Sequence, residues 1–196
     1  MTTNINNKAA STFLLLILIL VMGFSRDGLA QTKYIDRNGN ASFFSSAPLE
    51  DIEAHTSQAV SVVDVSTGEI AASMLMRSFR FRKSLMQEHF NENYIESHKY
   101  PKATFRGKIS NMSELDLNKD GTYKLDIDGE ITIHGVTKPL QIKADAAVNN
   151  GTLQAKAVFP LKVKDFDIKI PRLVIQNIAE EVEVTVSFNY KPMGDL

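Results

Sequence analysis

The sequence predicts an all-β protein of about eight antiparallel strands with one short α-helix near Ser84–Ser97. Apolar and polar residues alternate with a period of two through most of the chain after Thr122, which is the pattern of strands with one buried and one solvated face. Asn-Gly and similar turn sequences separate the alternating runs. Strands joined by short turns form a meander, which we expect to close into a barrel or to pack as a sandwich.

The first thirty residues, 1–30, are expected to be a signal peptide outside this fold. Lys8 precedes an apolar run, Phe13–Met22, and small residues end the segment at Ala30. An uncleaved membrane anchor is the alternative, but about ten apolar residues rise only about 15 Å as a helix, against a hydrocarbon core of about 30 Å. We therefore expect cleavage near Ala30, a mature domain of residues 31–196 without an integral membrane span, and a periplasmic or secreted protein.

The composition excludes several classes of protein. The chain has no cysteine, which removes disulfides, thiol nucleophiles and thiolate metal sites. Its formal net charge of −1 leaves no basic excess for phosphate groups, so we expect no nucleic-acid partner.

Turn residues divide the front half of the chain into strand-like runs. Asn38-Gly39 is one predicted turn, and Ser66-Thr67-Gly68 is another. Between them, Pro48–Ala54 is expected to be a connection. The strands joined by the two turns are expected at Lys33–Arg37, Ala41–Ser45, Ala59–Val65 and Ile70–Arg77.

The helix is predicted from a stripe of apolar residues with i, i+3, i+4 spacing. Polar residues occupy the opposite face, and the helix should stop before Tyr100-Pro101, because a residue that precedes proline avoids helical angles. Such a helix can cover one open end of a barrel or simply plug a core. The stripe consists of Leu85, Met86, His89, Phe90 and Tyr94.

The strands from residue 103 onward have an inner face almost without hydrogen-bonding or titratable groups. Asn149-Asn150-Gly151 turns the chain between two of them. A catalytic site needs convergent acids, bases or donors, so we expect no enzyme, no catalytic residue and no cofactor. The inner side chains that we predict to line a ligand cavity are Phe105, Leu125, Ile127, Ile131, Ile133, Phe159, Val184 and Phe188.

Several inward positions of these strands are small. Unfilled volume costs about 24 cal/mol per Å³, and an apolar ligand would convert that cost into affinity at about 25 cal/mol per Å². The alternative is that Phe105 and Phe159 fill the space themselves. The small inward residues are Gly129, Ala144, Ala146, Ala155 and Ala157.

The histidines do not have the spacing of a metal site, so no metal is expected. His134 lies in the segment Ile133–Pro139, which reads as a rigid hairpin because Gly135 permits a tight turn. A second hypothesis places His134 or Thr137 at the barrel mouth, in contact with the polar end of a ligand. Phe90 is the further rim candidate.

Three segments resemble the YceI-like family. GEITIHGVTKP, residues 129–139, is similar to the family's G-x-L-T-I-x-G-V-T-K-P hairpin, and ESHKYPKATF, residues 96–105, resembles its segment ending in Y-P-x-A-x-F. FDIKIP, residues 166–171, followed by the terminal Val-rich strand, is a third match. The matches occur in the family's order. RKSLMQEHF, residues 82–90, departs from the more usual R-D-x-H-L run.

The resemblance implies a lipocalin-like antiparallel barrel, export, and binding of a long isoprenoid or other apolar lipid-like chain. It carries over no catalytic residue. Our leading hypothesis is therefore an exported carrier or store for such a ligand. A structural or interaction module of the cell envelope with a filled core is the alternative, an enzyme is third, and a homodimer is left open.

Overall fold

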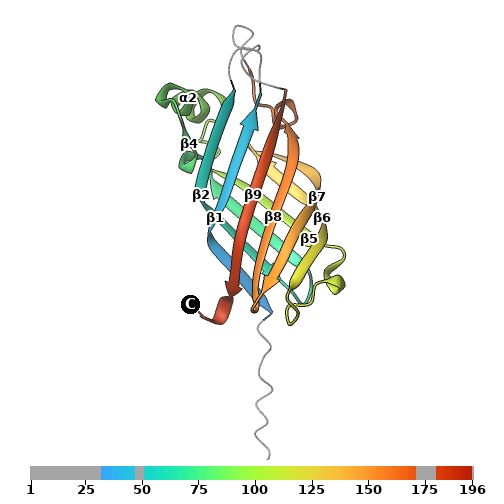
Figure 1. Ribbon diagram of the computed structural model, residues 1–196. Helices are drawn as coiled ribbons and strands as arrows, with labels where there is room; N and C mark the ends of the chain where they lie inside the picture. Colours follow the sequence, from blue (N-terminus) through green and yellow to red (C-terminus); the bar gives the residue numbers. More distant parts are fainter. Residues whose placement is uncertain (1–31, 47–50, 171–179, 196) are drawn as a thin grey trace, which may run out of the picture. The chain divides into compact units, whose positions relative to one another are not determined.

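In the described part of the chain, eight long antiparallel strands close into a barrel (Figure 1). This computed structural model describes residues 32–46, 51–170 and 180–195. Around the sheet the order is β1-β9-β8-β7-β6-β5-β3-β2, and β2 pairs with β1 to complete the circle, while the short β4 pairs with β2. The barrel prediction is confirmed over the sandwich. The strands are β1 (Lys33–Ser45), β2 (Ile52–Asp64), β3 (Glu69–Leu75), β4 (Arg80–Phe81), β5 (Lys102–Ile109), β6 (Gly121–Ile133), β7 (Val136–Asn149), β8 (Thr152–Lys162) and β9 (Glu181–Pro192).

Alternation builds the wall of the barrel as the sequence predicts. In β6, Leu125 and Ile127 are buried while Lys124 and Asp126 are exposed. The burial pattern of β8 alternates in the same way through most of its length. Each strand therefore gives one face to the interior and one to solvent.

Two-residue turns close the hairpins on either side of β7. His134 and Gly135 have φ angles of 52° and 77°, and Asn150 and Gly151 have 48° and 75°. Positive φ at both central positions is the requirement of the type I′ turn, whose twist suits a two-stranded hairpin. The hairpin reading of Ile133–Pro139 is confirmed.

The predicted turn at Asn38-Gly39 is wrong, because β1 runs without interruption from Lys33 to Ser45. The register of β1 against β2 shifts on either side of Gly39, which marks a β-bulge. Glycine permits a bulge as well as a turn. Because β1 and β2 remain paired on both sides of Gly39, the residue lies in a bulge. Glycine also meets a local steric need, because a Cβ on Gly39 would lie 2.3 Å from the ring of Phe188.

The predicted connection Pro48–Ala54 is wrong in its last part. Strand β2 already begins at Ile52, where it pairs with Ser45 of β1. Residues 47–50 lie outside the described residues. The predicted strand Ala59–Val65 is the second half of this longer strand.

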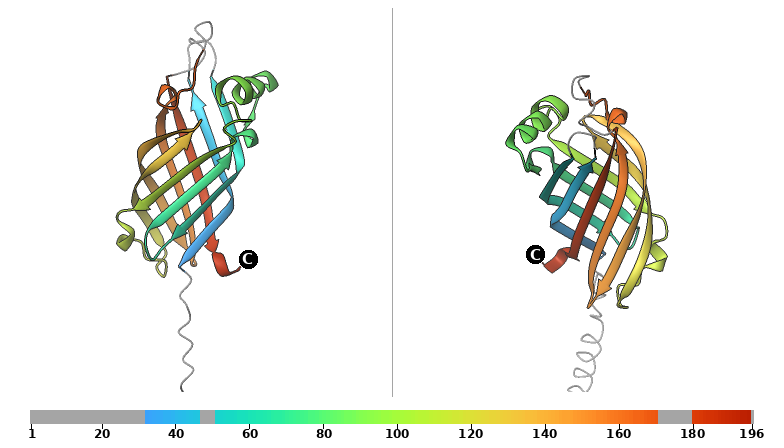
Figure 2. Two further views of the ribbon diagram at one scale, coloured as in Figure 1. Left: turned by 180° about the vertical axis from the view of Figure 1, so that it is seen from behind. Right: turned by 45° about the horizontal axis from the view of Figure 1, so that its top comes forward.

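The predicted helix is present but shorter than expected. An α-helix, α2 (Ser84–His89), continues directly into a π-helical turn, η2 (Phe90–Tyr94). The chain then leaves the helix, and Glu96 takes a left-handed φ of 47°. Both segments lie at one end of the barrel (Figure 2). Short 3₁₀ turns are η1 (Met76–Ser78), η3 (Met112–Glu114), η4 (Val163–Phe166) and η6 (Met193–Asp195).

Other expectations about the chain's organisation concern residues 1–30, which lie outside the described residues. Among residues 32–46, 51–170 and 180–195, no helix has the length and apolar character needed to cross a membrane.

Candidate functional site

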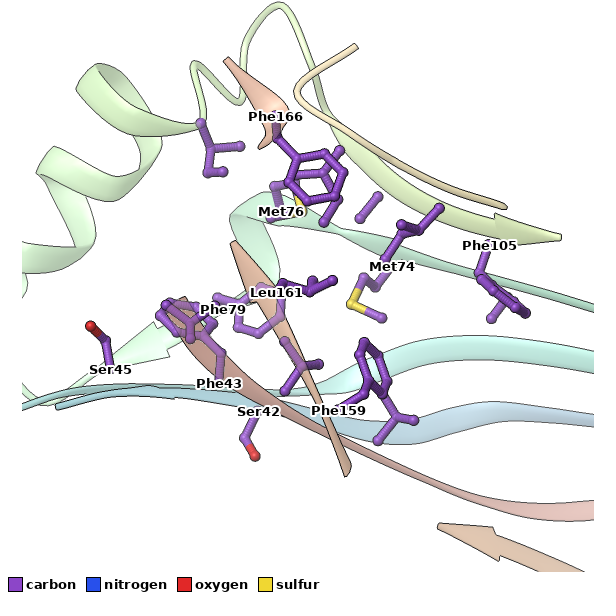
Figure 3. A pocket seen from close by; sticks show the side chains of 18 of the residues that line it. Ser42, Phe43, Ser45, Met74, Met76, Phe79, Phe105, Phe159, Leu161 and Phe166 are labelled. Carbon is purple, nitrogen blue, oxygen red and sulfur yellow. The ribbon is translucent and has the colours of Figure 1, made fainter. Parts of the chain in front are cut away.

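A cavity of about 530 Å³ lies inside the barrel and is lined almost entirely by apolar side chains. Ligand sites in proteins commonly enclose about 300–1,000 Å³. Strands supply most of the wall, and η1, α2, η2, η4 and the segments that flank them supply the rest. Figure 3 shows Met74, Phe105 and Phe159 around the space, whereas the hydroxyl of Ser42 points away from it.

The cavity reaches solvent at the end of the barrel where α2 lies. Leu85 of α2 lines the cavity and is nevertheless 59% exposed. At the opposite end, Val63, Val148 and Leu153 are at most 2% exposed and do not line the cavity. These side chains pack that end shut, so the cavity is blind.

Glycines in the wall leave room for two aromatic rings to lie close against the backbone. A Cβ on Gly129 would lie 2.6 Å from the ring of Phe105, and one on Gly107 would lie 2.8 Å from it. Phe188 lies in the same way against Gly39. The sequence suggested that Phe105 could fill the space left by Gly129. Instead the ring lies flat on the wall beside that glycine, and the lumen stays open.

Four phenylalanine rings cluster near the open end. Phe43, Phe79, Phe81 and Phe90 all line the cavity, and the centroids of their contacting rings lie 5.0–6.0 Å apart. Of the four, sequence reasoning identified only Phe90. The alternation of Phe79 and Phe81 in the sequence Phe-Arg-Phe was the available signal for two others.

The apolar stripe of the helix faces the cavity. Each of its five members lines the space, which confirms the reading of a helix that covers one end of the barrel. The stripe brings His89 and Tyr94 to the rim, and burial raises the pKa of the Tyr94 hydroxyl.

The polar group nearest the closed end of the lining, the Tyr190 hydroxyl, already has a hydrogen-bond partner within the protein. The Tyr190 hydroxyl lies 2.7 Å from Ser61 Oγ, and Ser61 donates to the carbonyl of Ala71. Burial raises the pKa of Tyr190 well above its usual range, and the hydrogen bond with Ser61 acts in the opposite direction. Among the described residues, no group of three His, Cys, Asp or Glu side chains could hold a metal ion.

Seven of the eight predicted lining residues border the cavity, as does the rim candidate Phe90. Leu125 is the exception: it is 3% exposed and does not border the space, although Ala144, its partner in β7, does. Ligand contact itself stays a prediction for all of them. The seven are Phe105, Ile127, Ile131, Ile133, Phe159, Val184 and Phe188.

The other two rim candidates lie outside the cavity lining. Thr137 is exposed and its hydroxyl lies 2.8 Å from that of Thr132. His134 donates from Nδ1 to the carbonyl of Phe166 at 3.0 Å, and its Nε2 lies 3.3 Å from the carboxylate of Glu96. Because Phe166 lines the cavity, His134 holds part of the wall rather than facing the space.

Glu96 joins this contact to a further cation. Lys99 Nζ lies 2.5 Å from Glu96 Oε1. The pKa of Glu96 is lowered by the hydrogen bond from Lys99 and by that from His134. Glu96, His134 and Asp167 all have positive φ, so three costly backbone conformations gather around one contact. We call His134, Glu96, Lys99 and the Phe166 carbonyl the latch.

A closed antiparallel barrel around one blind apolar cavity defines the structural class of this protein. Residues 38–190 match the YceI-like domain, and the chain belongs to the YceI-like family.

Curated relatives share part of the sequence. The chain is 37% identical over 84 residues to the UPF0312 protein VPA0850 of Vibrio parahaemolyticus, an alignment that covers 40% of this chain and 41% of the relative. It is 31% identical over 101 residues to protein YceI of Escherichia coli O157:H7, covering 48% and 47%. The chain thus spans less than half the length of either relative.

Solved structures share the fold. A polyisoprenoid binding domain from Saccharophagus degradans, implicated in plant cell wall breakdown, is similar with a TM-score of 0.71 at 13% identity, over 82% of this chain and 98% of that one. BcnA of Burkholderia cenocepacia is similar with a TM-score of 0.65 at 18% identity, over 78% and 96%.

Proposed function

We propose that this protein binds an isoprenoid or another apolar, lipid-like chain inside its barrel and carries or stores it. The observation that carries the proposal is the blind cavity of about 530 Å³ with its apolar lining. Water gains few hydrogen bonds in such a space, whereas each buried methylene of a ligand contributes about 0.8 kcal/mol. An apolar chain is therefore the class of ligand that this interior favours.

A similar structure supports the same class of ligand. The Saccharophagus degradans protein that shares the fold is described as a polyisoprenoid binding domain. Sequence identity to it is only 13%, so the proposal for the ligand of this chain depends on the chain's own cavity. We propose as ligand contacts the seven predicted residues that border the cavity, with Phe90 at the rim.

Extraction of the purified protein tests whether it carries a native ligand. The full-length chain is expressed in a bacterium, purified without detergent and extracted with organic solvent, and the extract is analysed by mass spectrometry. We expect an apolar chain compound in stoichiometric amount. An empty protein that also takes up no isoprenoid alcohol would contradict the proposal.

A pair of variants on β8 locates the binding in the cavity. Ala157 lines the cavity and Val158, the next residue, is 48% exposed on the outside. Ala157→Phe places a ring in the lumen, and Val158→Phe adds the same ring to the outer face. We expect Ala157→Phe to lose the extracted compound while Val158→Phe retains it. Equal retention by both variants would show that the compound binds elsewhere.

We propose in addition that the protein is exported and acts in the periplasm or outside the cell. The apolar run Phe13–Met22 and the small residues up to Ala30 support export. Intact mass measurement of protein from the cell envelope and the medium tests this point. We expect a chain that begins at or close to Gln31, and a full-length chain in the cytoplasm would overturn export without touching the binding proposal.

A further inference from the structure

The closed end of the cavity lies at a fixed depth. Val148, Leu153 and Tyr190 pair side by side across β7, β8 and β9, and each is at most 2% exposed. Tyr190 reaches past β1 to Ser61 of β2, where the two hydroxyl oxygens lie 2.7 Å apart. A side chain held at both ends cannot move aside as easily as a free aliphatic one.

Phe188 lies next to this layer, toward the open end. Its ring lies against Gly39, and its centroid is 5.7 Å from that of Tyr190. Phe188 and Tyr190 both line the cavity. We call these two residues the floor.

Beside Phe188, and from there toward the open end, the wall includes small residues. Ala155 pairs with Phe188, and Ala157 pairs with Ala144 on one side and with Val186 on the other. All of them line the cavity. Further toward the open end, Phe159 pairs with Val184 and side chains become large again. The lumen therefore has room down to the floor and no room below it.

We propose that the depth of this cavity selects the length of the apolar chain that the protein binds, with Phe188 and Tyr190 as the stop. The inference rests on the proposed function, since it requires a chain in the lumen. Each carbon that enters the cavity leaves water, and about 0.8 kcal/mol per methylene corresponds to about a fourfold gain in affinity. A carbon added after the chain has reached the floor stays at the open end and gains nothing.

Displacement of a fluorescent fatty-acid analogue by 1-alkanols of increasing length measures this directly. For the wild-type protein, we expect Kd to fall by about fourfold per methylene and then to level off at one length. A Kd that keeps falling through the longest soluble alcohol would overturn the length selection. If no alcohol displaces the analogue and the analogue itself does not bind, the proposed function fails as well.

A variant that raises the floor provides the sharper comparison. Ala155→Leu fills lumen space beside Phe188, its partner in β9, whereas Gln154→Leu, the same change one residue earlier, faces solvent. We expect Ala155→Leu to level off at a chain shorter by two or more carbons, and Gln154→Leu to level off where the wild type does. If Kd levels off at the same alcohol length in all three proteins, the floor does not set that length. The solubility limit of the alcohols would then account for the plateau.

Phe188→Leu tests the opposite direction. Removing the ring deepens the lumen toward Val148 and Leu153, so the plateau should move to longer chains. A large-to-small change in a core is destabilising, and Ala155→Leu keeps the proposal testable if this variant does not fold. A folded Phe188→Leu protein with an unchanged plateau would contradict the role of the ring.

Discussion

At the scale of single residues, the latch shows how one histidine can serve the cavity without facing it. His134 occupies a positive-φ position of a tight hairpin and bonds the backbone of Phe166, 32 residues later in the chain. Tyr100 packs edge-on against the imidazole, with ring centroids 4.4 Å apart. The contact ties the β6–β7 hairpin to η4, and so fixes the part of the cavity wall that Phe166 forms.

Glu96→Gln should make the protein less stable above about pH 5. Lys99 and His134 lower the pKa of Glu96 in the folded state, so its charged form stabilises the fold. That contribution is complete above the ordinary value of 4.5 and is lost as the pH falls through the lowered folded value. We therefore expect a lower Tm for the variant at pH 7 and a difference that shrinks toward pH 3, measured by circular dichroism.

Glu130→Gln is the matched control, because Glu130 is an exposed carboxylate on the outer face of β6. Its Tm should follow the wild type at every pH. A Glu96→Gln profile parallel to that of the wild type down to pH 3 would contradict the latch.

At the scale of elements, the bulge in β1 depends on a side chain that accepts hydrogen bonds from backbone N–H groups. The Asp36 carboxylate accepts from the N–H of Asn38 at 2.9 Å and from the N–H of Asn189 in β9 at 2.7 Å. Asp36 is 8% exposed, so these donors have little access to water. The bulge in turn places Gly39 behind the ring of Phe188, which links the irregular strand to the shape of the lumen.

Asp36→Ala should lower the free energy of unfolding by about 2–5 kcal/mol, because it leaves two backbone donors without an acceptor in a largely buried site. Asp36→Asn, which retains one acceptor oxygen, should lose less. Urea unfolding followed by circular dichroism measures both. Asp126→Ala on the exposed face of β6 is the control and should change stability by about 0.5 kcal/mol or less. An Asp36→Ala protein as stable as this control would refute the role of the carboxylate.

At the scale of the whole barrel, ligand binding and stability are linked. A ligand that binds only the folded state at about 100 times its Kd adds about 2.7 kcal/mol, and 1 kcal/mol shifts Tm by about 2–4 °C in a domain of this size. Saturating farnesol should therefore raise the Tm by about 5–10 °C. Differential scanning fluorimetry with increasing farnesol measures the shift.

Ala157→Phe separates binding in the lumen from unspecific effects of the alcohol. The added ring occupies the cavity, so its Tm should not respond to farnesol, while Val158→Phe should respond as the wild type does. An equal rise in both variants would assign the effect to the surface of the protein.

The sequence by itself determined the class of fold and the polarity of its two faces. Period-two alternation sets which side chains point inward, since a one-residue slip would expose the entire apolar set. The hairpin turns at His134-Gly135 and Asn150-Gly151 could also be read, because positive φ at two adjacent positions leaves few residue choices. The turn predicted at Asn38-Gly39 was wrong, because the same residues permit a bulge when the flanking strands continue to pair.

Only the tertiary structure decided at which depth each inward side chain lies. Leu125 and Ile127 are two residues apart on one face and both are buried, yet Ile127 borders the cavity and Leu125 does not. Their difference depends on closure of the barrel, which fixes where every strand begins relative to its neighbours. The partners of His134 depend on it as well, because Glu96 and Phe166 come from distant parts of the chain. Alternation is a local property of each strand, whereas depth and long-range contact exist only once the sheet has closed on itself.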